Sequence, residues 1–213
     1  MSQSFPNAGN AIIVLALRDV IVEHKASLSE VDGAIGDGDH GINMAKGFSM
    51  AADSLDPTAS LSEGLKHLGN TLLEDIGGSM GPLYGNFFRK MARASRKEAR
   101  ITATVFETML SDAITSLVDL GGAKVGDKTL LDVLDPAITA YREALATGES
   151  FDSALGILGA SAEAAKEGTK DMVAKLGRAA RLGERSRGVI DAGAASCSLI
   201  LNTLSAEFTK RLG

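Results

Sequence analysis

Residues 31–44 read VDGAIGDGDHGINM, a glycine-rich acidic segment that leads directly into the start of a helical pattern. Three aspartates, Asp32, Asp37 and Asp39, fall within eight residues, and the intervening glycines leave the backbone free to turn sharply. Their carboxylates can therefore converge on one point. Because two such charges 4 Å apart repel each other by about 4 kcal/mol at an effective dielectric of 20, a bound cation is expected to compensate for them.

Carboxylate ligands alone favour a hard cation, and a loop that leaves coordination positions for water and phosphate oxygens suits Mg²⁺ better than Ca²⁺. An EF-hand beginning at Asp37 fails, because its sixth and twelfth positions would be Ile42 and Phe48 instead of glycine and glutamate. The plainer alternative is an acidic surface loop with Asx-turns, which the spacing of the three aspartates disfavours. The sequence therefore predicts Mg²⁺ with a phosphate ligand.

The residues that follow the aspartates predict the start of a helix. His40 and Asn43 would lie on its first turn, where free backbone N–H groups favour anions. A phosphate group could thus meet a metal ion and a helix end together.

The alternation of a glycine-rich connection with an amphipathic helix recurs along the whole chain. Apolar residues spaced by three and four predict a first helix that begins near Asn7, another in the middle of the chain and one near the C-terminus. The Ala-rich residues 151–176 are good helix formers, no segment shows the alternation typical of a strand, and each proline is expected at or near a helix start or connection. We therefore predict about eight antiparallel helices in an all-α fold. The apolar positions are Ile13, Leu17, Val20, Ile21 and His24; Ile101, Val105, Met109, Leu117 and Leu120; and Cys197, Leu201, Leu204, Phe208 and Leu212.

Glycines gather in residues 33–41, 77–85, 121–126 and 177–193, which are predicted to be loops. In an up-and-down array of helices, alternate connections lie at the same end. Several of these loops could therefore share one rim and form a single site from four distant segments.

The composition limits the class of protein. With 213 residues, 45% of them hydrophobic, the chain can bury the core of one domain spanning residues 1–213. Its net charge of −5 argues against a broad nucleic-acid footprint. Cys197 cannot form an internal disulfide, and neither a signal peptide nor a membrane-spanning stretch is evident. We expect a cytoplasmic protein that binds neither nucleic acid nor membrane, with Cys197 as a small buried side chain.

Residues 121–129, GGAKVGDKT, resemble a P-loop, but Asp127 is inserted between Gly126 and Lys128 and the preceding residues are predicted to be helical. The insertion displaces both the lysine and the backbone N–H groups that a P-loop needs at fixed offsets, so this assignment is rejected. The glycines could still line a nucleotide pocket, with Thr129 capping the next helix, or form a plain connection.

Two other loops could contact phosphate. Residues 77–82, GGSMGP, precede an apolar helix and could allow a phosphate to approach the backbone, although a structural turn explains them almost as well. Of the four arginines at 178, 181, 185 and 187, no more than one or two are expected to reach a nucleotide, the alternative for each being a solvated basic loop that contacts a partner. His24 and His67 are expected to be structural, and no serine carries the sequence of a nucleophile elbow.

Five ordered motifs together resemble the L subunit, or L domain, of dihydroxyacetone kinases. They begin with Asp32 and the aspartate segment through Asn43 and Met44. In order, the others are Gly77-Gly-x-x-Gly-Pro-Leu-x-Gly, Gly126-Asp-Lys-Thr, Gly177-Arg and Gly183-Glu-Arg-Ser. The resemblance covers nearly the whole chain.

The resemblance implies an eight-helix barrel with the nucleotide, ADP or ATP, at one rim. It also implies two Mg²⁺ ions held by Asp32, Asp37 and Asp39. Two segments depart from the family pattern: Gly-Gly-Ser79-Met80-Gly replaces Gly-Gly-x-Ser-Gly, and Asp191-Ala192-Gly193 replaces Asp-Pro-Gly. The implied nucleotide contacts are His40, Gly41, Ile42, Asn43, Ser79, Met80, Gly121, Leu130, Arg178, Asp191, Ala192 and Gly193.

The same resemblance implies a division of labour. A histidine on a separate K subunit would bind the short ketose, so no catalytic residue is expected in this chain, which would present the phosphoryl donor. ADP could be a fixed cofactor rephosphorylated by a phosphotransferase-system protein, or it could exchange with ATP in a triose or tetrulose kinase. A non-enzymatic nucleotide or metal sensor is the alternative from another class, and a homodimer is left open.

Overall fold

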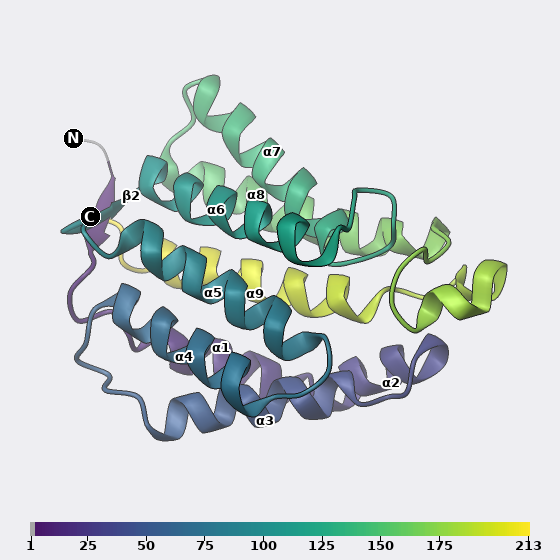
Figure 1. The fold of residues 1–213 in the computed structure, drawn as a ribbon. Helices are drawn as coiled ribbons and strands as arrows, with labels where there is room; N and C mark the ends of the chain where they lie inside the picture. The colour runs from purple at the N-terminus through teal and green to yellow at the C-terminus, as the bar shows by residue number, and fades with distance from the viewer. Residues whose placement is uncertain (1–2) are drawn as a thin grey trace.

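Amphipathic helices close into a ring in the computed structural model, which describes residues 3–213 (Figure 1). Each helix of the ring contacts the next one along the chain, and the last contacts the first. This is the up-and-down helical barrel that the sequence predicts. The eight helices of the ring are α1 (Ile13–Glu23), α3 (His40–Asp53), α4 (Leu61–Asp75), α5 (Met80–Ser95), α6 (Ala103–Gly121), α7 (Leu131–Ala146), α8 (Phe151–Gly168) and α9 (Ala192–Thr209).

The first predicted helix is in fact two helices, because α1 ends at Glu23 and α2 (Lys25–Ile35) follows after a break at His24. The Nδ1 atom of half-buried His24 lies 2.9 Å from the Val20 carbonyl oxygen, so its role is structural, as predicted. Helix α2 packs on α3 and α9 outside the ring. The start predicted near Asn7 was wrong: α1 begins at Ile13.

The core fills the inside of the ring. One cluster of buried hydrophobic residues includes side chains from α1 to α9, so every α-helix of the described chain contributes to it. Phe87 and Phe88 of α5 lie edge to face, with ring centroids 5.0 Å apart. Cys197 is buried in α9, as expected of a small apolar side chain. His67 is also structural, since its Nε2 lies 3.0 Å from the Ala51 carbonyl oxygen.

A two-stranded sheet joins residues near the N-terminus to residues near the middle of the chain. Strand β1 (Ser4–Pro6) pairs antiparallel with β2 (Arg100–Thr102), and Phe5 faces Ile101 in the register. The expectations of no strand and of a helical Ile101 were both wrong, because α6 begins at Ala103. Three-residue strands are too short to show a period of two, which explains the error.

Two further boundaries differ from the expectation. Pro136 lies within α7, in its second turn, although each proline was expected at or near a helix start or connection. Helix α8 ends at Gly168, so the helical pattern predicted over residues 151–176 stops early. Two 3₁₀ segments, Thr169–Asp171 and Ala179–Ser186, follow before α9.

The topology places four connections at one end of the barrel. Because neighbouring helices alternate in direction, the α2–α3, α4–α5, α6–α7 and α8–α9 connections share one rim, while the small sheet and the C-terminus lie at the other (Figure 1). These four connections contain the four glycine-rich segments that the sequence placed on a shared rim.

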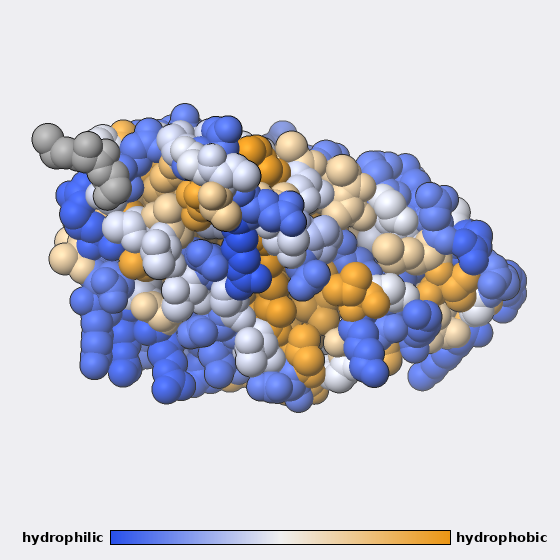
Figure 2. Space-filling view, turned by 90° about the horizontal axis from the view of Figure 1, so that it is seen from above, coloured by the Kyte–Doolittle hydropathy of each residue, from blue (hydrophilic) through white to orange (hydrophobic). Residues whose placement is uncertain are grey.

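The surface seen in Figure 2 mixes charged residues with several groups of apolar side chains. Among the residues described, none of the helices combines the length and apolarity that crossing a bilayer requires.

Candidate nucleotide and metal site

The four connections at the rim surround a cavity of about 490 Å³. Each connection, or the helix end next to it, places at least one glycine in the wall of the cavity. The lining glycines are Gly36, Gly77, Gly78, Gly121, Gly177 and Gly193. A cavity of this size fits a small ligand, and the absence of side chains at these positions allows the ligand to approach the backbone.

The three predicted metal ligands converge at the edge of this cavity. One oxygen from each of Asp32, Asp37 and Asp39 lies within 4.8 Å of the other two. Asp32 is half-buried, whereas Asp37 and Asp39 are exposed. A Cβ atom at Gly36 would lie 2.4 Å from Asp32 Oδ1, so only glycine lets the loop fold over that carboxylate. The all-oxygen donor set fits Mg²⁺.

Two contacts partly neutralise these carboxylates. The Arg178 guanidinium forms an ion pair with Asp37 across the cavity mouth. The backbone N–H of His40 donates to Asp32 Oδ2 at 3.3 Å. Asp39 receives no side-chain hydrogen bond or ion pair from the residues described, which leaves its carboxylate available to a cation.

Four helix N-termini meet the cavity. The first residues of α3, α5, α7 and α9 are His40, Met80, Leu131 and Ala192, and each of them lines the wall. Every helix N-terminus carries a partial positive charge and free N–H groups. These four helix ends create a positive electrostatic potential in the cavity, although the protein as a whole is acidic. The three aspartates that can hold cations lie beside them. Such an arrangement can bind a metal-associated phosphate.

The structure brings most of the predicted site residues together in this cavity. Besides the three aspartates, the residues implied as nucleotide contacts that line it are His40, Asn43, Ser79, Met80, Gly121, Leu130, Arg178, Asp191, Ala192 and Gly193. Ser79 is exposed just before α5, and its hydroxyl makes no hydrogen bond within the described residues. At the second family departure, Asp191 Oδ2 accepts from Ala194 N at 2.8 Å, so this cap orders the start of α9.

Gly41 and Ile42 are the two implied nucleotide contacts that do not line the cavity. Gly41 is buried where α3 crosses α2: a Cβ atom there would lie 2.1 Å from the Lys25 carbonyl oxygen. The Ile42 side chain is 51% exposed on the outside of α3. Successive residues of a helix point in different directions, so the first turn cannot aim all its side chains at one ligand.

Replacing Gly41 with alanine is expected to destabilise the fold by about 2 kcal/mol, because the added methyl group overpacks the contact between α2 and α3. Urea unfolding would measure the loss. Gly156→Ala is the matched control: its Cβ atom would meet nothing within 4 Å in the middle of α8, and it should stabilise slightly. Equal stability of the Gly41→Ala variant and the wild type would contradict the close packing.

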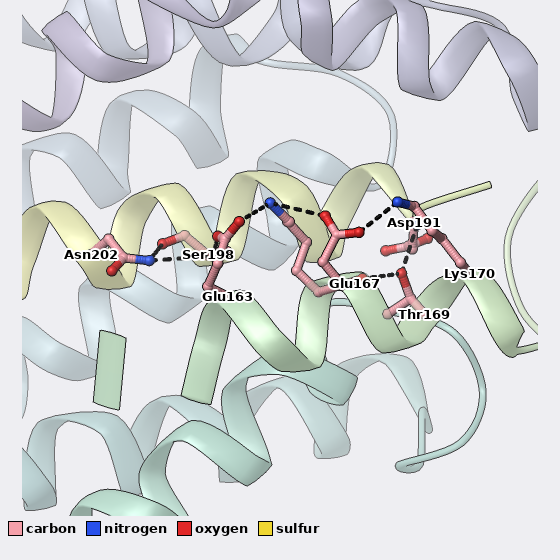
Figure 3. Close-up of polar contacts among 8 residues, drawn as sticks. Glu163, Glu167, Thr169, Lys170, Asp191, Ser198 and Asn202 are labelled. Atoms are coloured by element: carbon pink, nitrogen blue, oxygen red, sulfur yellow. Dashed lines mark hydrogen bonds and ion pairs between the residues drawn. The ribbon is translucent and has the colours of Figure 1, made fainter. Parts of the chain in front are cut away.

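A polar network fixes the start of α9 against α8 (Figure 3). Ser198 Oγ donates to Glu163 Oε2 at 2.9 Å, and Asp191 N donates to Thr169 Oγ1 at 3.1 Å. Lys166 pairs with Glu163 on the same helix.

Burial raises the pKa of the Asp191 carboxyl to about 6, and its hydrogen bond from Ala194 opposes that shift. Burial likewise lowers the pKa of His40, while the charge of Asp32 raises it.

Replacing Asp191 with asparagine is expected to stabilise the protein at neutral pH, by on the order of 1 kcal/mol. The folded-state pKa of about 6 lies above the ordinary value of 3.8, so ionisation of the buried carboxyl costs stability above pH 6. That cost disappears as the pH falls towards 4, while asparagine preserves the helix cap. Urea unfolding of both proteins at pH 4.5 and 7.5 should therefore show a difference that grows with pH. A constant difference would contradict the raised pKa.

Several residues at the cavity were not singled out from the sequence. Tyr84, Leu83 and Leu117 are apolar positions of α5 and α6 that look like ordinary core residues in the sequence. Lys128 also lines the wall, but its Nζ donates to the carbonyl oxygens of Met172, Ser186 and Val189. This use of the lysine, together with the helix in place of a strand before it, supports the rejection of a P-loop.

Thr129, which the sequence suggested as the cap of α7, lies one residue before its N-cap, Leu130, which has no side-chain cap. Thr129 Oγ1 accepts from Leu131 N at 3.2 Å, and the Thr129 N–H donates to Asp132 Oδ2 at 2.7 Å. The Asp132 carboxylate also accepts from the N–H of Gly126. These reciprocal bonds order the connection that precedes α7.

The fold and the site define a class of protein, an all-helical barrel with an acidic, glycine-lined cavity at one rim that suits a metal-associated phosphate. Residues 34–206 match the family described as the DAK2 domain. The chain belongs to the DAK2 domain family.

Its relatives include named kinases and kinase subunits. The chain is 36% identical over 189 residues to the PEP-dependent dihydroxyacetone kinase, ADP-binding subunit DhaL, of Escherichia coli, covering 88% of this chain and 90% of the relative. It is 37% identical over 187 residues to the ADP-binding subunit DhaL of PEP-dependent dihydroxyacetone kinase 1 of Listeria innocua, covering 86% of this chain and 88% of the relative. It is 34% identical to a D-erythrulose kinase of Mycolicibacterium smegmatis, covering 89% of this chain but 33% of the relative.

A solved structure has the same fold. The dihydroxyacetone kinase of C. freundii in complex with AMP-PNP and Mg²⁺ matches with a TM-score of 0.68 and 25% identity, covering 97% of this chain and 35% of that one. The chain thus spans about a third of that enzyme, and it corresponds to a helical part of it.

Proposed function

We propose that this chain is the nucleotide-binding subunit of a dihydroxyacetone-type kinase, a phosphotransferase. The carrying observation is the convergence of Asp32, Asp37 and Asp39 at the edge of a cavity into which four helix N-termini point. The names of the relatives in E. coli and L. innocua support ADP as the nucleotide. The chain would present the phosphoryl donor for transfer to a short ketose held on a separate K subunit.

In the proposed site, the three aspartates hold magnesium, two ions by analogy with the family. When bound, Mg²⁺ neutralises charge on the phosphate oxygens. The residues of this chain position the nucleotide. The N-termini of α3 and α5 would contact the phosphates, Arg178 would supply a further positive charge, and the residues from Asp191 to Gly193 and Leu130 would line the rest of the nucleotide pocket.

The rim also offers a surface for a partner subunit. Three large apolar side chains are exposed near it: Leu120 at 50%, Val125 at 57% and Leu176 at 38%. Leu120 and Leu176 line the cavity itself. Contact with a K subunit would cover these side chains and exclude water from the phosphoryl group, which favours transfer over hydrolysis.

Two donor arrangements are consistent with this site. ADP could stay bound and be rephosphorylated by a phosphotransferase-system protein, as the name of the PTS-dependent Lactococcus lactis relative suggests for that protein. Alternatively, ATP could exchange freely, which the erythrulose kinases among the relatives make a second candidate.

The first experiment is to purify the protein without added nucleotide, denature it and identify what is released, with magnesium measured alongside. Stoichiometric ADP with magnesium is expected for a fixed cofactor, whereas an empty protein that binds ATP reversibly would indicate the exchanging kinase. Turnover with a K-type partner separates an enzyme subunit from a sensor. A protein that binds neither nucleotide in Mg²⁺ would overturn the proposal.

A further inference from the structure

Three side chains from separate helices form a hydrogen-bonded chain that ends at the cavity. Tyr84 Oη of α5 lies 2.7 Å from Ser196 Oγ of α9, and Ser196 Oγ lies 2.9 Å from Nε2 of His40 at the start of α3. Ser196 is fully buried and Tyr84 is 2% exposed. Of the three side chains, His40 and Tyr84 line the cavity. Both ends of the hydrogen-bonded chain therefore reach the cavity, and its middle member, Ser196, is buried behind the wall.

The chain also controls the first turn of α9. Tyr84 Oη lies 3.2 Å from the Gly193 carbonyl oxygen, and Ser196 Oγ lies 3.2 Å from the carbonyl oxygens of both Ala192 and Gly193. Ala192 and Gly193 belong to the cavity wall. One buried cluster thus connects two walls of the site, α3 and α9.

Tyr84 keeps its proton, because burial raises the pKa of its hydroxyl well above its usual value. The Tyr84 hydroxyl can donate either to Ser196 or to the Gly193 carbonyl oxygen, and the Ser196 hydroxyl either to Nε2 of His40 or to the carbonyl oxygens of Ala192 and Gly193. In one of these arrangements Tyr84 donates to Ser196 and the serine hydroxyl donates to Nε2 of His40. The imidazole then carries its proton on Nδ1. That nitrogen makes no hydrogen bond within residues 3–213, and it belongs to a side chain that lines the cavity.

We propose that Tyr84 and Ser196 are positioning residues that hold the His40 ring and fix its tautomer, so that Nδ1–H donates to a phosphate oxygen of the bound nucleotide. This inference rests on the proposed function. It assigns the fine geometry of the site to two buried side chains that do not themselves need to touch the ligand, as outer hydrogen-bond partners do for histidines elsewhere.

The test measures binding of Mg²⁺ and ADP by calorimetry in Ser196→Ala and Tyr84→Phe variants of the full chain. We expect Ser196→Ala to weaken ADP affinity about tenfold and Tyr84→Phe to weaken it less, because Ser196 retains its contact with His40. In a His40→Ala background, neither change should weaken binding further. Additional losses in that background would overturn the proposal, since they would show a general structural effect.

Matched controls remove a hydroxyl elsewhere in the core. Ser95 is as fully buried as Ser196 and donates to the Met91 carbonyl oxygen, and Tyr141 is fully buried with its hydroxyl bonded to the Ala103 carbonyl oxygen. Ser95→Ala and Tyr141→Phe should lower the midpoint of thermal unfolding without changing ADP affinity. Tyr84→Phe retains the ring, so it tests the chain even where Ser196→Ala folds poorly.

A second readout does not require nucleotide. Nitrogen-15 NMR at a pH where histidine is neutral reports which ring nitrogen carries the proton, with His40 assigned by the loss of its signals in His40→Ala. We expect the Nδ1–H tautomer in the wild type and a shift towards Nε2–H in Ser196→Ala. A wild type with the proton on Nε2 would overturn the inference, whereas a failure of ADP to bind a protein with the expected tautomer would contradict only the proposed function.

Discussion

Replacing Asp39 with asparagine is expected to weaken Mg²⁺-dependent ADP binding at least about 100-fold, equivalent to about 2.7 kcal/mol. Asp39 lies within 4.8 Å of the oxygens of Asp32 and Asp37, so its loss removes one of three proposed metal ligands. An amide retains the shape of the side chain but not the charge that holds the cation. Calorimetric titration of ADP at a fixed Mg²⁺ concentration measures the effect.

Asp39 is a cleaner probe than its two neighbours, because Asp32 accepts a backbone N–H and Asp37 pairs with Arg178. Its side chain makes no such contact, so the fold should remain intact. Removing one of three clustered negative charges should even raise the thermal midpoint of the metal-free protein. Asp112→Asn, on the exposed side of α6, is the charge-matched control and should bind ADP normally. Unchanged affinity of Asp39→Asn in Mg²⁺ would sink the proposed metal site.

Measuring ADP binding without Mg²⁺ separates the contribution of the metal to affinity from that of the protein. Chelation should reduce the affinity of the wild type towards that of the Asp39→Asn variant, because phosphate would then meet the carboxylates without an intervening cation. The helix N-termini and Arg178 remain in both proteins. The residual affinity therefore measures what the protein contributes without the metal.

The periodicity of apolar residues predicted the helices because each helix must bury one face in the core, whereas the closed barrel was implied by the family resemblance. The prediction failed where the feature that sets an element's boundary does not repeat along the sequence. The break between α1 and α2 falls at His24 without glycine or proline to mark it, and the two strands have three residues each. Pro136 shows the opposite case: proline usually marks a helix boundary, yet α7 continues through it.

The acidic loop could be identified from the sequence because its ligands are neighbours in the chain. The Tyr84–Ser196–His40 cluster could not, since His40 and Ser196 are 156 residues apart and meet only when the ring closes. Gly41 shows a third limit. A motif indicates that a glycine is needed but not the reason, and here a close contact between α2 and α3 explains the need.

Replacing Lys128 with methionine is expected to cost about 3 kcal/mol of stability, because three carbonyl oxygens lose a charged donor that is almost completely buried. The Lys128 side chain is 1% exposed, and its Nζ lies 3.2 Å from the Met172 oxygen and 2.7 Å from the Val189 oxygen, with Ser186 as the third partner. Methionine preserves the apolar stem, so the change tests the ammonium group. Urea unfolding measures the loss.

The same variant should loosen the segment between α8 and α9, which carries Arg178. This segment has 3₁₀ turns in place of a long helix, and Lys128 joins its beginning to its end. Hydrogen exchange in residues 172–190 should therefore accelerate more than in the ring helices, and ADP affinity should fall about tenfold as Arg178 loses its position. Lys175→Met is the control, since that side chain is 62% exposed and pairs only loosely with Asp127. Wild-type protection of residues 172–190 in Lys128→Met would show that the buried ammonium does not hold the segment, and Lys128 would then be free to act at the phosphates.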